Sequence, residues 1–359
     1  MREHLYALGV SLIEIIQYWF VEWEPFFEQV NSFYNPGNVL EVLFPVVAFI
    51  DSVFASQLLL VTSFGGCLNG ILKWWLLEDR PYWWVRETTY YTGTARPKLY
   101  QTAQTCETGP GCPSGHTATA ASILILAIMW ISHILNDRKW KFEYWKYLVY
   151  PIFASQMLSV MLARMYVATH FPHQCLLGAL IGAFIAPALC LYVADPYIWH
   201  YGHYSTQTTS SSIKKHLIVA LLTAAVCVLT YFGLMLSGID PHATVKLAFR
   251  WCENPDSIHV STTPLYALVQ CSSTLIGWAL FVSPAVAKYR HDTYNRSFIL
   301  AAFSTILITY GFHYIDNIIP KDSVLKFYAF NSILSCLKPL LFLRVVPQVA
   351  MWPFRNKSK

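Results

Sequence analysis

The stretch Cys175–Ala194 reads CLLGALIGAFIAPALCLYVA and contains no Asp, Glu, Lys or Arg in 20 residues. A helix of about 20 apolar residues is what crosses the hydrocarbon core of a bilayer. Thr117–Leu135 and Leu217–Gly238 have a similar length and also lack these charged residues. These three stretches predict membrane-spanning helices and set the fold class.

The composition of the whole chain supports a membrane protein. Of its 359 residues, 55% are hydrophobic and 13% are charged, whereas charged residues make up about a quarter of a soluble domain. A soluble enzyme of this composition would expose large apolar patches, which are rare, and a disordered chain would be more polar. The net charge of +5 is spread thinly, so nothing indicates a nucleic-acid partner.

Six further apolar stretches complete the prediction: an all-α polytopic membrane protein with about nine transmembrane helices and one transmembrane domain over residues 39–352. They are Val39–Phe54, Ser56–Leu77, Tyr147–Ala163, Pro264–Val286, Phe298–Phe312 and Phe327–Met351. Glu41 and Asp51 interrupt the first stretch, and Lys338 and Arg344 lie within the last.

Residues 1–38 do not resemble a cleaved secretory signal, which would show one uninterrupted apolar run and a cleavage site. Apolar residues recur there at helical spacing, namely Leu5, Leu8, Leu12, Ile15 and Trp19. This stripe is typical of an amphipathic helix lying in the membrane interface. Packing of the same stripe against the helical bundle would explain it equally well.

The distribution of Lys and Arg predicts the orientation. With nine spans, one set of loops and the tail 353–359 carry twelve basic residues, and the longer opposite set carries eight outside the candidate site. Basic residues favour the cytosolic side. The C-terminal tail is therefore expected in the cytosol, and the N-terminus in the lumen or outside the cell.

Three polar clusters lie at the ends of predicted spans, and the parity of the spans puts all three on one side of the membrane. They are Lys73 with Arg80, the segment Pro113-Ser114-Gly115-His116, and Arg164 with His170. Taken alone, each Lys or Arg would more often extend its side chain to the lipid headgroups, and each His would more often pack inside the protein. Their combination favours one shared pocket.

The residue types in this pocket suit phosphoryl transfer. Arg and Lys side chains bind phosphate oxygens, and the helix start behind Ser114 offers unpaired N–H groups to an anion. Two histidines can supply a nucleophile and an acid for the leaving oxygen. The residues themselves do not decide which histidine attacks. The cations already supply positive charge, so we expect no metal and no cofactor.

The three clusters resemble the three-part signature of the type 2 phosphatidic acid phosphatase superfamily. Longer phrases are similar to the glucose-6-phosphatase catalytic subunit family within it. These phrases are Arg80–Val85 (RPYWWV), Cys106–Gly111 (CETGPG), His170–Gln174 (HFPHQ), Trp251–Asp256 (WCENPD) and Thr262–Pro264 (TTP). The resemblance extends over essentially the whole chain and implies a helical-bundle phosphatase core.

The resemblance also implies roles for individual residues. His170 attacks phosphorus and forms a phosphohistidine, and His116 protonates the leaving sugar oxygen. The phosphate-binding residues are Lys73, Arg80, Ser114, Gly115 and Arg164. Glu107 and His173 are candidate sugar contacts or orienting groups, although Glu107 could equally serve the rigid turn Thr108–Gly111.

The implied substrate is glucose 6-phosphate, hydrolysed to glucose and phosphate on the lumenal side of the endoplasmic reticulum membrane. Besides membrane lipids, a glucose-6-phosphate transporter is a candidate partner. Two alternatives stay open: the same chemistry on another sugar phosphate or a lipid phosphate, and a non-catalytic membrane protein with a vestigial site.

Two positions depart from the wider superfamily pattern. Ala163 stands where that pattern has Ser, and Gln174 stands where it has Asp. Gln174 is shared with the glucose-6-phosphatase branch and argues against a lipid phosphatase. An amide cannot hold His170 by charge, so the group that orients His170 is left open.

Three cysteines fall in loops on the expected lumenal side, where disulfides persist. A Cys106–Cys112 bridge would span the Gly-Pro-Gly turn and brace the start of the phosphate-binding helix. Cys252 is the alternative partner, and three free thiols are the third possibility. A bridge at Cys106 predicts that reductant lowers activity more than expression.

Overall fold

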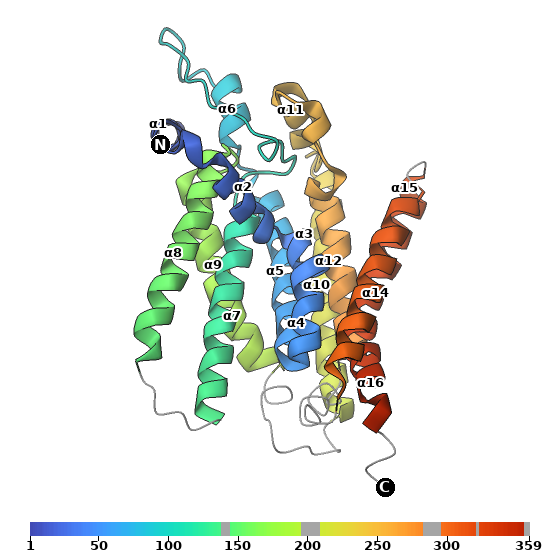
Figure 1. Cartoon of the computed structure of the whole chain (residues 1–359). Helices are drawn as coiled ribbons and strands as arrows, with labels where there is room; N and C mark the ends of the chain where they lie inside the picture. The colour runs from blue at the N-terminus through green and yellow to red at the C-terminus, as the bar shows by residue number, and fades with distance from the viewer. Residues whose placement is uncertain (138–143, 195–208, 283–295, 321–322, 355–359) are drawn as a thin grey trace. The chain divides into compact units, whose positions relative to one another are not determined.

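The computed structural model describes residues 1–137, 144–194, 209–282, 296–320 and 323–354, and all regular structure within them is helical (Figure 1). The long helices are α5 Ser52–Leu76, α7 Gly115–Asp137, α8 Trp145–Tyr166, α9 Pro172–Leu189, α10 Thr209–Leu236, α12 Pro264–Phe281, α14 Phe298–Ile318 and α15 Val324–Leu340. Other α-helices are α1 Arg2–Trp19, α2 Glu24–Phe33, α3 Pro36–Asn38, α4 Phe44–Ile50, α6 Pro81–Glu87, α11 Ala243–Trp251 and α16 Val346–Met351. Short 3-10 or π segments are Val21–Trp23, Val39–Leu43, Cys190–Ala194, Pro255–Ser257, Val260–Thr262, Leu341–Val345 and Trp352–Phe354.

Eight helices in the described residues are long and apolar enough to cross a membrane. They correspond to eight of the nine predicted spans, so the all-α polytopic fold class is confirmed. Most of the tail 353–359 lies outside the described residues.

The first predicted span differs from the expectation. Its residues form an apolar helical segment, Pro36–Ile50, that is about 22 Å long at 1.5 Å per residue. The segment ends because Asp51 leaves the helical conformation and its carboxylate accepts hydrogen bonds from the N–H groups of Val53 and Phe54, capping α5. The acidic residue that interrupts the sequence pattern thus marks a helix boundary.

The two basic residues in the last predicted span both have polar partners. Nζ of Lys338 lies 3.9 Å from Oε1 of Glu41, and Nε of Arg344 donates a hydrogen bond of 2.7 Å to the carbonyl of Phe281. Pairing is what makes charged side chains tolerable among spanning helices.

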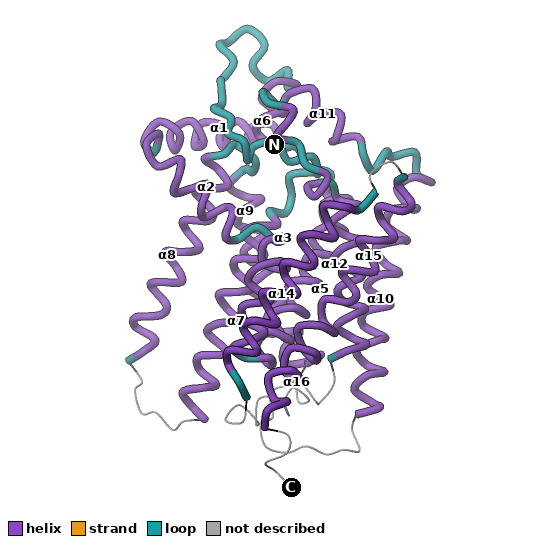
Figure 2. Tube along the Cα trace, turned by 45° about the vertical axis from the view of Figure 1, so that its right-hand side comes forward, coloured by secondary structure: helices purple, strands orange, loops and turns teal. Residues whose placement is uncertain are grey.

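The chain forms two compact units. The first comprises Met1–Pro36, Leu68–Phe184 and Cys227–Ala267, and the second comprises Gly37–Cys67, Ile185–Val226 and Leu268–Lys359. Every candidate site residue belongs to the first unit. Its α1, α6 and α11 lie at one end, next to the long loops of the same unit (Figure 2). Aromatic side chains of α1, α6 and the segment after α8 form a buried core there.

Within the first unit, α1 buries a different face from the one that the sequence pattern suggested. Tyr6, Val10 and Ile13 are buried, whereas Leu8 and Trp19 of the predicted stripe are about 70% exposed. Packing of that stripe against the bundle, one of the two interpretations, is therefore wrong. An apolar face remains on the outside of the protein.

Candidate active site

Two cations of the site come from the end of α5 and the start of α6. Lys73 lies in the last turn of α5, and Arg80 caps α6, which has Pro81 at its first position. Leu77 between them has a φ of 48°, a left-handed conformation that costs energy for a residue with a side chain. This tight reversal brings Arg80 back into the protein, where it is completely buried.

Arg80 is held by backbone carbonyls of two loops. Its Nε donates to Gly109 at 2.6 Å and its NH2 donates to Pro110 at 3.3 Å. Its NH1 donates to Thr169 at 3.3 Å and also lies 3.3 Å from Nε2 of His170. The guanidinium therefore links the Gly-Pro-Gly turn to the histidine loop.

Arg164 and His170 lie on either side of the C-terminal end of α8. Arg164 is in the last turn of this helix and is 1% exposed. The chain then reverses at Ala168, whose φ is 54°, so that His170 is buried beside the two arginines. Nδ1 of His170 is 2.7 Å from the carbonyl oxygen of Gly111, which leaves Nε2 directed toward Arg80.

The third cluster forms the start of α7. The hydroxyl of Ser114 accepts from the N–H of Thr117 at 3.5 Å, and its own N–H donates to the carbonyl of Gln174. A Cβ at Gly115 would lie 3.3 Å from Oδ1 of Asn69, so glycine allows α5 and α7 to approach closely. His116 follows in the first turn and is 7% exposed.

Glu107 lies at the centre of these groups. Its Oε2 is 2.8 Å from NH1 of Arg80, and its Oε1 accepts a short hydrogen bond from NH2 of Arg164. The same carboxylate is 3.7 Å from Nδ1 of His116 and 3.9 Å from Nε2 of His170. Lys73 also acts on it electrostatically. An anion therefore already sits between the arginines and both histidines.

The charges of this cluster follow from burial and proximity. Burial alone would raise the pKa of Glu107, but Arg164 and Arg80, followed by the two histidines, hold it well below the usual value. Burial, followed by Arg80 and Arg164, lowers the pKa of His170 well below its usual value. Glu107 is therefore ionised and His170 is neutral at pH 7. Nε2 of His170 then has a lone pair that can accept a hydrogen bond from Arg80 or attack an electrophile.

His173 lies outside the cation cluster. Its Nε2 is 2.8 Å from Oε2 of Glu78, and its ring stacks near Tyr6 and Phe171. Glu78 also accepts from Nε2 of Gln174 at 3.0 Å, and its backbone carbonyl accepts from the N–H of Gly111. Glu78, Gly109 and Gly111 also support the site, and none of them was a predicted site residue. The rigid turn Thr108–Gly111 was the available sequence signal for the two glycines.

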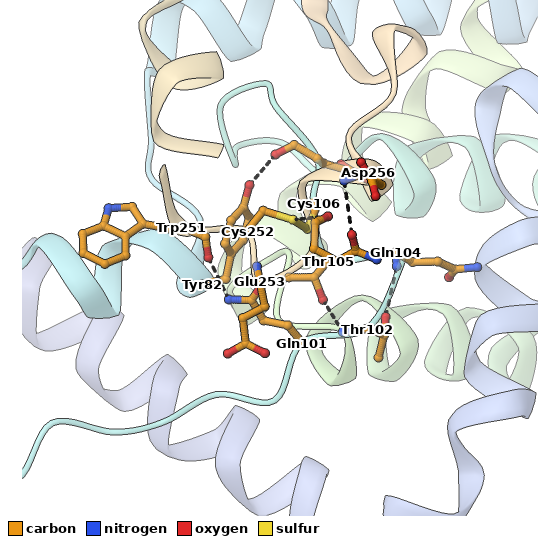
Figure 3. Close-up of a disulfide and its surroundings, with 12 residues drawn as sticks. Tyr82, Gln101, Thr102, Gln104, Thr105, Cys106, Trp251, Cys252, Glu253 and Asp256 are labelled. Carbon is orange, nitrogen blue, oxygen red and sulfur yellow. Dashed lines mark hydrogen bonds between the residues drawn. A yellow bond between two sulfur atoms is a disulfide. The ribbon is translucent and has the colours of Figure 1, made fainter. Parts of the chain in front are cut away.

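The disulfide joins Cys106 to Cys252, 146 residues apart (Figure 3). Cys112 is a free buried thiol. The proposed Cys106–Cys112 bridge is therefore wrong, and the alternative partner is correct. Around the bridge, Gln101 donates to the carbonyl of Trp251 and accepts from the N–H of Glu253. These contacts attach the segment after α11 directly to the loop that carries Glu107.

Comparisons with known proteins find relatives over nearly the whole chain. The sequence profile of the PAP2 superfamily matches residues 54–198, which include all three clusters. Glucose-6-phosphatase catalytic subunit 1 of Canis lupus familiaris is 29% identical, covering 99% of this chain and 97% of its own length. Glucose-6-phosphatase 2 of Homo sapiens is 29% identical, with 96% of each chain covered.

A third relative has the highest identity of the three. Glucose-6-phosphatase catalytic subunit 1 of Haplochromis nubilus is 30% identical, and the match covers 77% of this chain and 76% of the relative. No solved structure matches. The profile match includes the three clusters, and the relatives match over most or nearly all of their length. The chain therefore belongs to the glucose-6-phosphatase catalytic subunit family, within the PAP2 superfamily.

Proposed function

We propose that the chain hydrolyses glucose 6-phosphate to glucose and inorganic phosphate through a phosphohistidine. The observation that carries this proposal is the position of Glu107, whose carboxylate contacts Arg80 and Arg164 and faces both His116 and His170. A carboxylate and a phosphoryl group are bound by the same cations. The place of this carboxylate therefore marks where a phosphoryl group would be held.

Binding would begin with an exchange of anions. The substrate phosphate displaces the Glu107 carboxylate and takes over Arg80 and Arg164, with Lys73 and the N–H groups at the start of α7 completing the site. Such fixed positive groups stabilise the charge on the equatorial oxygens in the transition state. The displaced Glu107 stays attached to the pocket edge through Cys106, where it can accept hydrogen bonds from sugar hydroxyls.

Nε2 of His170 then attacks phosphorus while the bond from phosphorus to the sugar oxygen breaks. The Nδ1 proton of His170 remains on the hydrogen bond to the Gly111 carbonyl. His116 donates a proton to the leaving oxygen, and the negative phosphoryl group favours its protonated form. In the second step, neutral His116 takes a proton from water as the water attacks phosphorus, which releases phosphate and restores both imidazoles.

Three considerations support a lumenal site in the endoplasmic reticulum. The basic loops favour the cytosol, so the opposite side faces the lumen. This topology counts Pro36–Ile50 as a crossing, and the endoplasmic reticulum bilayer is thinner than average, at about 27 Å. The relatives are glucose-6-phosphatases by name. A charged substrate made in the cytosol would need a carrier, which makes a glucose-6-phosphate transporter the corresponding partner.

A comparison of substrates tests this function. The purified chain in lipid nanodiscs is assayed for phosphate release from glucose 6-phosphate, other hexose phosphates and phosphatidic acid. We expect glucose 6-phosphate to give the highest kcat/KM and an acid-labile phosphoenzyme that is absent in His170→Ala. Preference for phosphatidic acid, or no turnover of any substrate, would contradict the proposal.

A further inference from the structure

We propose that α1 and α2 form a hairpin that lies in the membrane interface on the active-site side, and that this contact holds α1 against the loop of His170. The two helices are bent too strongly to act as one straight span, because the segments Arg2–Trp19 and Val21–Phe33 meet at 78°. A hairpin that lies in the plane of the interface tolerates such a bend.

The outer face of the hairpin is apolar. On α1 the exposed residues Leu5, Leu8, Leu12, Ile15 and Trp19 repeat every three or four positions, which makes one stripe along the helix. Trp23, Phe26 and Phe33 extend the exposed apolar surface along α2 and the turn before it. We call these eight residues the outer stripe. A continuous apolar surface of this kind is covered by a partner in folded proteins.

Continuity with the membrane-spanning surface identifies lipid as that partner. Both helices of the hairpin pack against α8, with the ring of Phe27 at 4.9 Å from that of Tyr166 in its last turn. The sides of α8 expose Leu148 and Leu158, as expected for a lipid-facing span. Figure 1 shows α1 crossing the end of α8. The outer stripe therefore starts where the lipid-facing surface of α8 ends.

The aromatic and charged residues fit the same position. Tyr18, Trp19 and Trp23 are exposed around the bend, and Trp and Tyr concentrate at membrane–water interfaces. Residues 1–33 contain one arginine against five glutamates. Because the cytosolic leaflet is anionic, it repels a segment with this excess of glutamates. The hairpin is therefore expected on the opposite side of the membrane from the basic loops.

The inner face of α1 contacts the loop that carries the proposed nucleophile. The ring of Tyr6 stacks on that of Phe171 at 4.4 Å and 8°, and a Cβ added at Gly9 would lie only 2.7 Å from Phe171. Nε2 of Gln17 donates to the carbonyl of Tyr166 at 2.6 Å. The helix thus contacts both ends of the segment between Tyr166 and Phe171, and lipid on its outer face would keep it there.

Cysteine labelling tests the position of the hairpin without reference to activity. Leu8→Cys and Glu14→Cys form a matched pair, because both native side chains are exposed but only Leu8 belongs to the outer stripe. The seven native free cysteines are buried or half-buried, so the wild type gives a low background. Each variant in nanodiscs is treated with a membrane-impermeant maleimide.

We expect rapid modification of Glu14→Cys and little modification of Leu8→Cys. Modification of both would place the outer stripe in water, and modification of neither would place the hairpin across the bilayer. Modification of Leu8→Cys alone would show that the outer stripe faces water and that position 14 does not. Each of these three results would overturn the proposal.

The effect on the His170 loop rests on the proposed function and is measured by glucose 6-phosphate hydrolysis. A charge in the outer stripe, Leu8→Glu, should lower kcat by roughly tenfold, because misplacing a reacting group by about 1 Å can cost 10²-fold. KM should hardly change, because the residues assigned to phosphate binding are untouched. Glu14→Gln is the control and should keep the wild-type kcat.

Leu8→Asn is the second variant if Leu8→Glu does not fold. Wild-type kcat in a folded Leu8 variant would overturn the coupling to the loop. If the wild type itself does not hydrolyse glucose 6-phosphate, the proposed function fails while the labelling result still stands, so the two failures are distinguishable.

Discussion

The carbonyl oxygen of Gly111 lies 2.7 Å from Nδ1 of His170, and this neutral peptide group orients the imidazole. Gln174 braces the same loop: its Oε1 accepts from the N–H of Phe171 at 3.1 Å, and its Nε2 donates to the carbonyl of Asp79 at 2.9 Å. A neutral acceptor fixes the ring and its tautomer. Unlike a carboxylate, it adds no full negative charge that would favour the imidazolium.

The first prediction concerns Gly111. A Cβ at this position would lie 2.4 Å from the carbonyl of Asp79 and 2.8 Å from the side-chain amide of Gln174, so Gly111→Ala must displace the acceptor of His170. We expect kcat to fall by roughly 10²-fold, as for other misplaced catalytic groups. Steady-state kinetics measure this loss. Gly65→Ala is the control, because a Cβ there meets no atom within 4 Å. Equal kinetics of the two variants would contradict the role of Gly111.

The second prediction concerns the exchange of anions at Glu107. Glu107→Gln removes a charge that neutralises Arg80 and Arg164, so orthovanadate, a phosphate analogue, should bind more tightly. We expect the inhibition constant to fall by roughly tenfold, which corresponds to about 1.4 kcal/mol. Glu253→Gln, at an exposed ion pair with Arg86, should leave the constant unchanged. Weaker binding in Glu107→Gln would show that this carboxylate organises the arginines instead of competing with the phosphate.

The third prediction concerns pH. The pKa of His170 is well below 6.5 in the folded protein because burial and then Arg80 and Arg164 disfavour its cation. Below about pH 6.5 the unfolded chain binds a proton there that the folded chain does not. Neutral His170 therefore makes its full contribution to the free energy of unfolding above pH 6.5. This contribution is lost as the pH falls below 6.5. The pKa of Glu107 is held below 4.5, so that group loses its contribution only at more acidic pH.

Thermal unfolding in nanodiscs between pH 7 and pH 5 measures this effect. The Tm of the wild type should fall more steeply than that of His170→Gln, which lacks the titrating group. Parallel curves for the two proteins would argue against a strongly lowered pKa of His170.

The fourth prediction concerns the disulfide. Cys106 precedes Glu107, and the bridge to Cys252 closes a loop of 146 residues. Removing a native disulfide typically costs about 2–5 kcal/mol. Cys106→Ser and Cys252→Ser should therefore lower Tm, and each should lower activity more than expression, as should reductant. Cys112→Ser should behave like the wild type, because Cys112 is not bridged. Non-reduced peptide mapping that finds Cys106 and Cys252 as free thiols would contradict the pairing.

The fifth prediction concerns orientation. The acceptor sequons of the chain are Asn295-Arg-Ser297 and Asn356-Lys-Ser358, and both fall on the side assigned to the cytosol. Neither should be glycosylated, whereas a sequon fused to the N-terminus should be. Mobility on gels with and without glycosidase measures both. A shift of the native chain, or none for the fused sequon, would reverse the topology.

The sequence alone determined the fold class and the residues of the three clusters. Spans such as Cys175–Ala194 are recognisable because a bilayer imposes one length and one polarity on every crossing helix. Lys73, Arg80, His116, Arg164 and His170 were recognisable because anion chemistry needs cations and imidazoles at the ends of such helices. Both patterns depend on local composition and spacing, which a single sequence contains.

Only the tertiary structure decided how distant segments meet. The pairing of Cys106 with Cys252, the position of Glu107 between Arg80 and Arg164, and the Gly111 carbonyl on His170 all join segments that lie far apart in the chain. A carbonyl group is present in every residue, so the sequence does not show which carbonyl contacts His170. Likewise, a cysteine is written in the same way whether its thiol is free or bridged. The outer face of α1 was also undecided by periodicity, because α1 is apolar on two faces and only packing against Phe171 determines which of them is buried.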